Sequence, residues 1–235
     1  MPNSIIITGG TQRLGLAIAE NLCKKGYEVL VSYRKNHDSH QQLREKGVKL
    51  VQADFSTQGG IDDFIRYVKQ HYCALRGIIH NASDWAAEGD DDEPAALFNR
   101  MMQVHASAPY QMNLAFQSLL TQSDEVTDII HMTDYVQEKG SKKHIAYAAS
   151  KAALHNLTLS FAASLAPKVK VNSIAPALLM FNEHDDDVYK QKALKKSLLE
   201  ICPGAQEAVK AVNFLLDSDY VTGRTMSLDG GRHLK

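Results

Sequence analysis

Short runs of consecutive apolar residues alternate along the chain with longer segments in which apolar side chains recur every three or four positions. Runs of the first kind are typical of strands buried on both faces of a sheet, and segments of the second kind of helices with one buried face. Ile5–Ile7 is such a run, and Arg13–Lys25 has apolar residues at positions 14, 18 and 22 before Gly26 ends the segment. The chain therefore begins with a strand followed by a helix.

The same pattern continues to the end of the sequence. It predicts seven strands, over Ile5–Thr8, Glu28–Tyr33, Val48–Gln52, Gly77–His80, Asp128–Met132, Val169–Ile174 and Thr225–Leu228. It predicts helices over Arg13–Lys25, Ser39–Lys46, Ile61–His71, Ile145–Leu165 and Gln206–Leu216, and one long helix or two shorter ones over Leu97–Leu120. Because strands and helices alternate, the strands should pair in parallel through right-handed crossovers. Without a linker or repeat, we expect a single domain over residues 1–235 built as a doubly wound α/β sheet.

The composition of the chain bears on the size of its core and on whether it binds nucleic acid, membranes or metal. A chain of 235 residues with 44% apolar content can build one full core and bury roughly 70–75% of its unfolded surface. The net charge of −1 provides no basic field for nucleic acid. No apolar run approaches the ~20 residues of a membrane helix, and the N-terminus lacks the features of a secretory signal. Three widely spaced cysteines form no metal-type cluster. We expect a cytoplasmic protein with reduced thiols, no metal and no membrane partner.

Parallel sheets bind ligands outside the carboxyl ends of their strands, so the residues after each strand are the candidates for a site. The turn Thr8–Gly15 (T-G-G-T-Q-R-L-G) follows the first strand. Gly9 and Gly15 would let the backbone approach a pyrophosphate at the N-terminus of the next helix. Its spacing is not G-x-G-x-x-G, so the turn alone is equally consistent with a tight strand–helix connection.

The next strand ends suggest which nucleotide would bind. Tyr33 and Arg34 follow the second strand, where an NAD site usually has an acidic residue for the ribose 2′-hydroxyl. Arg34 and Arg13 would instead suit a 2′-phosphate, which favours NADPH over NADH. Taken alone, Arg34 fits a solvated surface residue better than a phosphate ligand. Asp54 follows the third strand and could accept a hydrogen bond from adenine, or could cap the following helix.

A phenol and an ammonium stand four residues apart in the segment Tyr147–Lys151 (Y-A-A-S-K). On a helix this spacing puts both side chains on one face. A nearby cation favours phenolate, so we expect Lys151 to lower the pKa of Tyr147 and suit the pair to general acid–base work. The spacing alone arises often by chance, but here it follows the fifth strand of a nucleotide-binding sheet.

The chain resembles the short-chain dehydrogenase/reductases over essentially its whole length, with motifs in the family's order: T-G-x-x-x-R-x-G, Asp54, Asn81-Ala82, Tyr147 with Lys151, Asn172–Pro176 and Asp229–Gly231. The resemblance implies a Rossmann-like sheet of about seven strands, hydride transfer from a nicotinamide and a homotetramer. It also implies cofactor contacts at Gly9, Arg13, Leu14, Gly15, Tyr33, Arg34, Asp54, Phe55, Asn81, Ala82, Ser83 and Lys151.

Two departures from the common family pattern resemble its pteridine reductase branch. Asp134 stands thirteen residues before Tyr147, where most members have serine, and Arg13 stands where most have glycine. That branch also has Asn-Ala-Ser followed by an aromatic residue that stacks on the pterin, here Trp85. The resemblance implies NADPH-dependent reduction of a dihydropterin, with weaker activity on dihydrofolate. It implies catalytic roles for Tyr147, Lys151 and Asp134 and substrate contacts at Arg13, Ser83, Trp85, Asp134 and Tyr147.

Several readings stay open at this stage. His105 takes the position of an asparagine that helps a water-linked proton path in many family members, but it reads equally as a packed helix histidine. The acidic runs Glu88–Glu93 and Glu183–Asp187 are solvated loops or a negative rim that disfavours the glutamate tail of folates. A general carbonyl or 3-ketoacyl reductase is an alternative, against which Asp134 argues. A non-catalytic NADPH-binding regulator is another, against which the intact Tyr147–Lys151 pair argues.

Overall fold

A single parallel sheet of seven strands organises the computed structural model, which describes residues 3–89, 93–122 and 124–235. Its strand order is β3-β2-β1-β4-β5-β6-β7, so the chain reverses direction across the sheet between β1 and β4. The strands are β1 Ser4–Thr8, β2 Glu28–Tyr33, β3 Lys49–Gln52, β4 Gly77–His80, β5 Thr127–Met132, β6 Val169–Pro176 and β7 Thr225–Leu228. This arrangement confirms the predicted doubly wound α/β fold.

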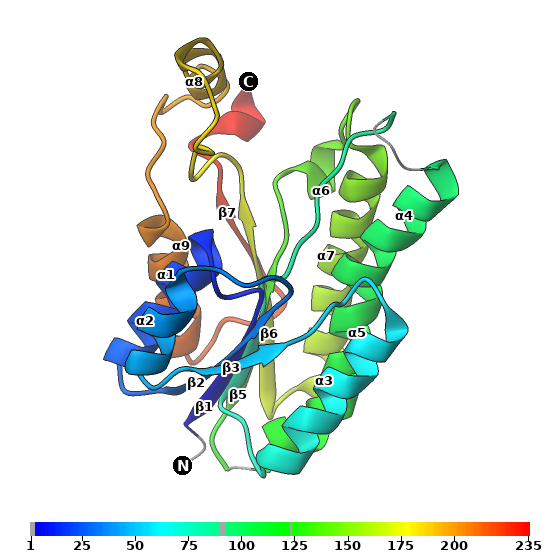
Figure 1. The fold of residues 1–235 in the computed structure, drawn as a ribbon, viewed down its shortest axis with the longest axis vertical. Helices are drawn as coiled ribbons and strands as arrows, with labels where there is room; N and C mark the ends of the chain where they lie inside the picture. Colours follow the sequence, from blue (N-terminus) through cyan, green and yellow to red (C-terminus); the bar gives the residue numbers. More distant parts are fainter. Residues whose placement is uncertain (1–2, 90–92, 123) are drawn as a thin grey trace.

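Helices cover both faces of the sheet, α1, α2 and α9 on one side and α3, α4, α5 and α7 on the other (Figure 1). The helices are α1 Arg13–Lys24, α2 Ser39–Glu45, α3 Gln58–His71, α4 Pro94–Met102, α5 Ala108–Leu120, α6 Val136–Lys139, α7 Ile145–Leu165, α8 Asp187–Leu194 and α9 Gln206–Asp217. A π-helical turn, η1 Gln103–Ser107, joins α4 to α5, and a 3₁₀ turn, η2 Arg232–Leu234, lies near the C-terminus.

The two helical layers explain why the central strands have apolar residues on both faces. Ile5 and Ile7 pack into the core beneath α1, α2 and α9, whereas Ile6 points the other way into the core beneath α3, α5 and α7. All three side chains are fully buried. Successive side chains of a strand point to opposite faces, so both faces of β1 need apolar residues.

The structure corrects several predicted boundaries. Helix α3 begins at Gln58, three residues before the predicted start, and β6 continues two residues further, to Pro176. The segment 97–120 is neither one α-helix nor two separate ones, because η1 joins α4 to α5 without a break. The short helices α6 and α8 and the turn η2 were not predicted from the sequence pattern.

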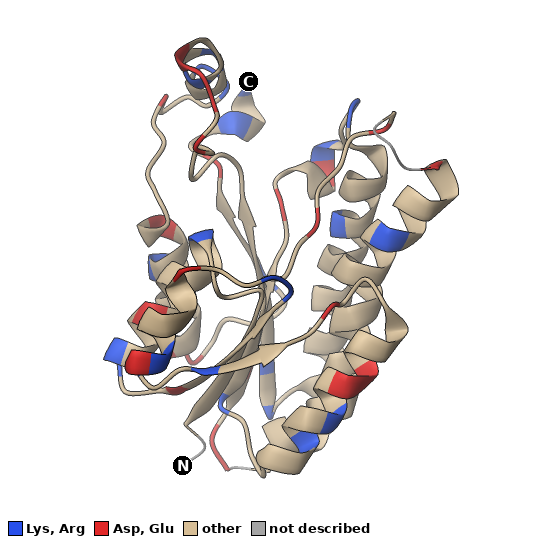
Figure 2. Cartoon of the chain, in the orientation of Figure 1, with Lys and Arg blue, Asp and Glu red and all other residues tan. Residues whose placement is uncertain are grey.

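Because all seven strands are parallel, their ends lie side by side at the carboxyl edge of the sheet. The ends of β1 and β4, where the chain reverses direction, are neighbours, which is where open α/β sheets bind ligands. Positions of Lys and Arg are interspersed with positions of Asp and Glu along the helices and loops (Figure 2). No helix within the described ranges is long and apolar enough to cross a bilayer.

Candidate functional site

The turn after β1 is locked to the end of β4. Asn81 donates its side-chain amide to the carbonyl oxygens of Thr8 and Gly9, at 3.1 and 2.7 Å. Gly9 has a φ of +65°, and a Cβ there would lie 2.8 Å from Cα of Ala82. A Cβ on Gly15 would lie 2.5 Å from the carbonyl oxygen of Gly9. The residue types at these positions therefore fix the backbone of a turn that faces the start of α1.

The N-terminus of α1 offers unpaired backbone donors. The Gln12 side chain does not cap this helix, and its first turn holds no acidic residue. The first N–H groups of such a helix are available to an anion. Leu14 packs its side chain against the core, so it would meet a ligand through its backbone.

Arg13 lies in the left-handed region, with a φ of +51°. Its guanidinium reaches across to the segment after β6, where Nη1 donates to Oδ1 of Asn182 at 2.8 Å. It therefore joins the opening turn to the segment that leads to α8.

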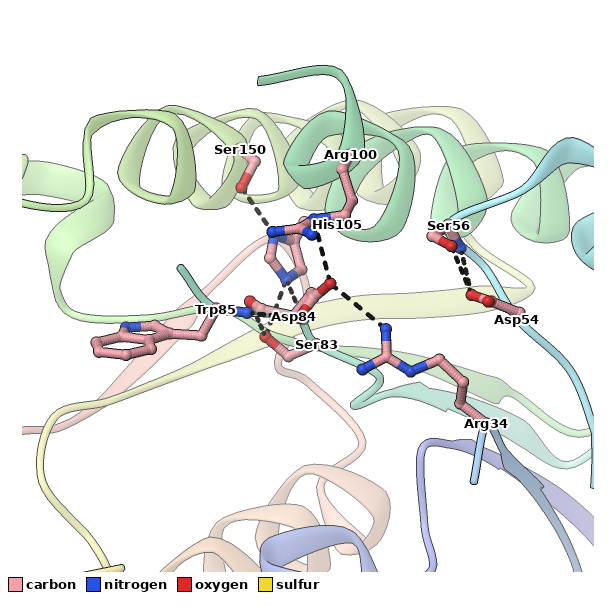
Figure 3. Close-up of polar contacts among 9 residues, drawn as sticks. All are labelled: Arg34, Asp54, Ser56, Ser83, Asp84, Trp85, Arg100, His105 and Ser150. Carbon is pink, nitrogen blue, oxygen red and sulfur yellow. Dashed lines mark hydrogen bonds and ion pairs between the residues drawn. The ribbon is translucent and has the colours of Figure 1, made fainter. Parts of the chain in front are cut away.

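The residues predicted to hold the adenosine end lie at the ends of β2 and β3. Tyr33 is half-buried and packs edge-on against the ring of His40. Asp54 Oδ1 accepts hydrogen bonds from the backbone N–H and the hydroxyl of Ser56, at 3.0 and 2.7 Å (Figure 3). Helix α3 is instead capped by Thr57, so the alternative of Asp54 as the cap is wrong. The ring of Phe55 is buried in the core, which leaves only its backbone for a ligand.

Asp134, Tyr147 and Lys151 meet beyond the end of β5. The hydroxyl of Tyr147 donates to Oδ2 of Asp134 at 3.0 Å. Lys151 donates from Nζ to the carbonyl oxygen of Met132 at 2.9 Å, and Nζ lies 5.5 Å from the centre of the Tyr147 ring. Helix α7 supplies the phenol and the ammonium one turn apart, as the sequence predicts.

Burial dominates the protonation of these three groups. Burial raises the pKa of Asp134, against the opposing effects of the Val136 N–H, Lys151 and Tyr147. Burial and the neighbouring Asp134 carboxylate raise the pKa of Tyr147 well above its ordinary value. Burial lowers the pKa of Lys151 to about 8, although Asp134 opposes the shift. The expectation that Lys151 makes Tyr147 more acidic is therefore wrong: Tyr147 is a neutral hydrogen-bond donor.

His105 is buried within η1 and connects three elements of the site (Figure 3). Its Nε2 accepts the backbone N–H of Asp84 at 3.1 Å and lies 2.9 Å from Oγ of Ser83. Because Nε2 accepts, Nδ1 carries the proton of the neutral ring and donates to Oγ of Ser150 at 2.8 Å. Ser150 in turn donates to the carbonyl oxygen of Tyr147 at 2.7 Å.

Burial, followed by the charge of Lys151, lowers the pKa of His105 well below its ordinary value, so the ring stays neutral. The ring packs edge-on against Tyr147, with centroids 5.4 Å apart. A cavity of about 10 Å³ lies between His105 and His80, which is room for one water. His105 is thus a packed, fully bonded histidine that fixes the Ser83–Asp84 backbone against α7.

Trp85 is the exposed aromatic side chain of the site, with 63% of its surface accessible. Its ring lies on His144, with centroids 4.3 Å apart and planes at 36°. His144 stands at the start of α7, so this contact brings the segment after β4 to the helix that carries Tyr147.

Parts of the two acidic runs have local structural partners. The Glu88 carboxylate accepts the N–H groups of Ile145 and Ala146 at 2.7 Å each and so caps α7. Burial would raise the pKa of Glu88, but these N–H donors outweigh it and lower the pKa. Asp186 caps α8 through the N–H of Tyr189. Residues 90–92 of the first run lie outside the described residues.

Sequence reasoning missed two residues near these groups. Asp84 lies between Ser83 and Trp85 and contacts Arg34 and Arg100. Arg232 lies over the ring of Tyr135, 4.0 Å from its centroid, and lines a cavity of about 370 Å³ between the ends of β6 and β7. The acidic residue inside an otherwise small or aromatic N-A-S-D-W segment was a signal for Asp84, whereas nothing in the sequence indicated the position of Arg232. Within the described ranges, no cluster of three metal-ligating side chains occurs.

Known proteins resemble the chain over its whole length. The family model described as enoyl-(acyl carrier protein) reductase matches residues 10–233. Dihydromonapterin reductase from Klebsiella pneumoniae is 52% identical over 235 residues, which are 100% of this chain and 98% of that protein. The dihydromonapterin reductase of Escherichia coli K12 is 51% identical with the same coverage.

Solved structures also resemble the chain over nearly its whole length. The structure of FolM alternative dihydrofolate reductase 1 from Brucella canis, complexed with NADP, has a TM-score of 0.88 at 26% identity and covers 99% of this chain and 94% of its own. An acetoin dehydrogenase from Enterobacter cloacae, with a TM-score of 0.87 at 23% identity, covers 100% of this chain and 96% of its own and shares the fold. Together with the sequence relatives and the site geometry, these matches show that the chain belongs to the short-chain dehydrogenase/reductase family.

Proposed function

We propose that the protein reduces 7,8-dihydromonapterin to 5,6,7,8-tetrahydromonapterin with NADPH, and reduces dihydrofolate more weakly. The observation that carries the proposal is the 3.0 Å hydrogen bond between Tyr147 and Asp134, in the position where ketone-reducing members have a serine. Relatives that are about half identical over the full chain and named for the same activity support it. A carboxyl–phenol pair suits protonation of a ring nitrogen, whereas a hydroxyl suits polarisation of a ketone.

The residues present fit an NADPH molecule. The uncapped start of α1 and the turn locked by Asn81 suit its phosphates. Arg34 at the end of β2 suits its 2′-phosphate, and Lys151 keeps N–H donors beyond its bond to Met132 for the nicotinamide ribose. When bound, the cofactor supplies a hydride to C6 of the pterin. Such use agrees with the NADP complex of the Brucella canis neighbour.

The chain's own side chains would hold the pterin and its proton. Trp85 provides an exposed ring for stacking, worth roughly 0.5–1.5 kcal/mol beyond the buried area. Ser83 would bind the amino-pyrimidine edge and Arg13 the carbonyl edge. Asp134, whose pKa burial raises, and the neutral phenol of Tyr147 hold a proton beside ring nitrogen N5.

We also infer a single domain and a cytoplasmic homotetramer. Exposed apolar side chains on α5 and α7, namely Tyr110, Leu114 and Leu159, support burial of this surface between subunits. Light scattering on the protein eluting from a sizing column tests the assembly, and a monomeric mass would reject it.

The proposed activity is tested with the only tryptophan of the chain. The protein is saturated with NADP⁺ and titrated with 7,8-dihydromonapterin while Trp85 fluorescence is followed, with correction for pterin absorption. NADPH consumption is then assayed with 7,8-dihydromonapterin, dihydrofolate and a panel of ketones. Saturable quenching with turnover of the pterin supports the proposal. Reduction of ketones without quenching or pterin turnover would reject it.

A further inference from the structure

Asp84 has a carboxylate that the proposed chemistry does not use. Its Oδ2 lies 3.4 Å from Nη1 of Arg34 and 3.4 Å from Nε of Arg100 (Figure 3). Its Oδ1 accepts the backbone N–H of Trp85 at 3.0 Å, and its own N–H is bonded to His105. The side chain is only 17% exposed. Asp84 is therefore held firmly between the two residues proposed to bind the pterin.

The contact between Arg34 and Asp84 crosses the groove proposed for the cofactor. Arg34 follows β2 and Asp84 follows β4, and β1 lies between those strands in the sheet. Neighbouring strands are about 4.8 Å apart, so the ion pair spans roughly two strand spacings above the end of β1. The turn Thr8–Gly15 begins at that end. The ion pair therefore bridges the entrance to the turn that would hold the cofactor's phosphates.

We propose that Asp84 is an internal anion that holds Arg34 in the ligand-free protein, and that the 2′-phosphate of NADP(H) replaces it there. The inference rests on the proposed use of NADPH. NADP(H) offers Arg34 a new anionic partner in exchange for Asp84, whereas NAD(H) has no phosphate at that position and offers none. Asp84 is thus a specificity-determining residue for the cofactor.

The same exchange of partners would link cofactor binding to Ser83 and Trp85, the residues proposed to bind the pterin. Once Arg34 moves to the 2′-phosphate, Asp84 keeps Arg100 and the Trp85 N–H but loses its partner across the groove. Ser83 and Trp85 flank Asp84 directly, so the residues proposed to bind pterin sense whether a 2′-phosphorylated nucleotide is bound. A nucleotide without that phosphate leaves the ion pair in place.

The first test measures the Kd of NADP⁺ and of NAD⁺ by isothermal titration calorimetry for wild type, Asp84→Asn, Arg34→Gln and the double variant. Partly exposed ion pairs are weak, so Asp84→Asn is expected to tighten NADP⁺ binding by between about 1.5-fold and 5-fold. The Kd of NAD⁺ is expected to stay unchanged. Arg34→Gln is expected to weaken NADP⁺ binding, and adding Asp84→Asn to that variant is expected to have no further effect.

A matched variant separates this exchange from a general loss of negative charge. Asp63→Asn removes one carboxylate from an exposed pair with Arg66 on α3, and it is expected to leave both Kd values unchanged. Equal NADP⁺ affinity in wild type and Asp84→Asn, or equal tightening of NADP⁺ and NAD⁺, would overturn the inference. Failure of the wild-type protein to bind NADP⁺ would overturn the proposed function and this inference together.

The second test follows the coupling through Trp85 emission. The probes are 2′,5′-ADP and 5′-AMP, because neither carries the nicotinamide that itself quenches indole. In the wild type, 2′,5′-ADP is expected to change the emission and 5′-AMP to leave it unchanged. The change should be lost in Asp84→Asn, although that protein still binds 2′,5′-ADP. A change of the same size in both proteins would refute the coupling.

Discussion

In the proposed function, Asp134 is the residue that distinguishes this site from that of a ketone reductase. Its carboxyl group accepts from Tyr147, and burial raises its pKa, so the pair can hold a proton that a serine in its place could not. We predict that Asp134→Ser lowers kcat for 7,8-dihydromonapterin by about 10²-fold, the size of a lost general acid–base contribution. Steady-state assays of NADPH oxidation measure the loss, with the Kd of NADP⁺ as the control. Undiminished turnover would remove Asp134 from the mechanism.

We predict that Lys151 sets the upper pH limit of the proposed reaction. Burial lowers its pKa to about 8, so the ammonium that would hold the nicotinamide ribose is present below that pH and is lost above it. We predict that kcat/KM falls as the pH rises through about 8. Asp134 raises the pKa of Lys151, so Asp134→Asn should move this fall to lower pH. Measurements of kcat/KM for the wild type and Asp134→Asn from about pH 6 to pH 10 test this shift. Identical pH profiles for the two proteins would contradict the prediction.

At the residue scale, sequence reasoning predicted which side chains meet better than it predicted their protonation. The family resemblance placed Asp134 and Tyr147 in one site, and the structure brings the two groups together. The direction of the Tyr147 pKa did not follow, because it depends on burial, and a sequence does not show how far a helix end is covered. The roles assigned to these residues remain predictions.

At the scale of elements, apolar patterns predicted the strands more closely than the helix ends. Each predicted strand is present, and the signal is clearest in the central strands, whose apolar residues are buried on both faces. The predicted start of α3 was too late because Gly59 and Gly60 are unfavourable for a helix. In the structure, Thr57 caps the start of α3 by accepting the N–H of Gly60. The turn η1 was missed because widening a helix by one residue leaves its apolar spacing almost unchanged.

The two glycines at the start of α3 should respond oppositely to alanine. A Cβ at Gly60 would lie 2.1 Å from the carbonyl oxygen of Asp54, whereas a Cβ at Gly59 would meet no atom within 4 Å. We predict that Gly60→Ala destabilises the fold by about 1–3 kcal/mol. Gly59→Ala should stabilise it by about 0.5 kcal/mol, because alanine loses less backbone entropy. Urea unfolding of both variants measures the difference, and equal effects would contradict the close packing of α3 on the Asp54 loop.

At the scale of the whole molecule, a chain of buried polar groups crosses the layer between the sheet and its helices. His80 donates from Nε2 to Oδ1 of Asn113 at 2.8 Å, and Asn113 donates to Nε2 of His131 at 3.2 Å. His131 Nδ1 then donates to Thr158 on α7 at 2.8 Å. These four side chains join β4, β5, α5 and α7 without a charge. The network depends on neutral histidines, so its stability depends on pH.

Three buried histidines therefore make the fold sensitive to acid. Burial lowers the pKa of His80 to about 4 and the pKa values of His105 and His131 well below the ordinary value. In the unfolded chain each titrates near pH 6.5, so below that pH the unfolded state binds protons that the folded state excludes. Stability is lost as the pH falls. We predict that the three histidines together remove about 4 kcal/mol of unfolding free energy between about pH 7.5 and pH 5.5.

Burial also raises the pKa values of Asp128 and Asp134, which stabilises the fold as the pH falls and so opposes the effect of the histidines. The contribution of one histidine is therefore best measured in a variant that removes that histidine alone. In His80→Gln the glutamine amide can still donate to Asn113 but binds no proton. Its loss of stability over the same pH range should be smaller than that of the wild type by about 1.4 kcal/mol, one third of the total. Urea unfolding at the two pH values measures both losses. Equal losses in the two proteins would show that His80 already binds a proton in the folded state, which would place a charge inside the network that joins the sheet to α7.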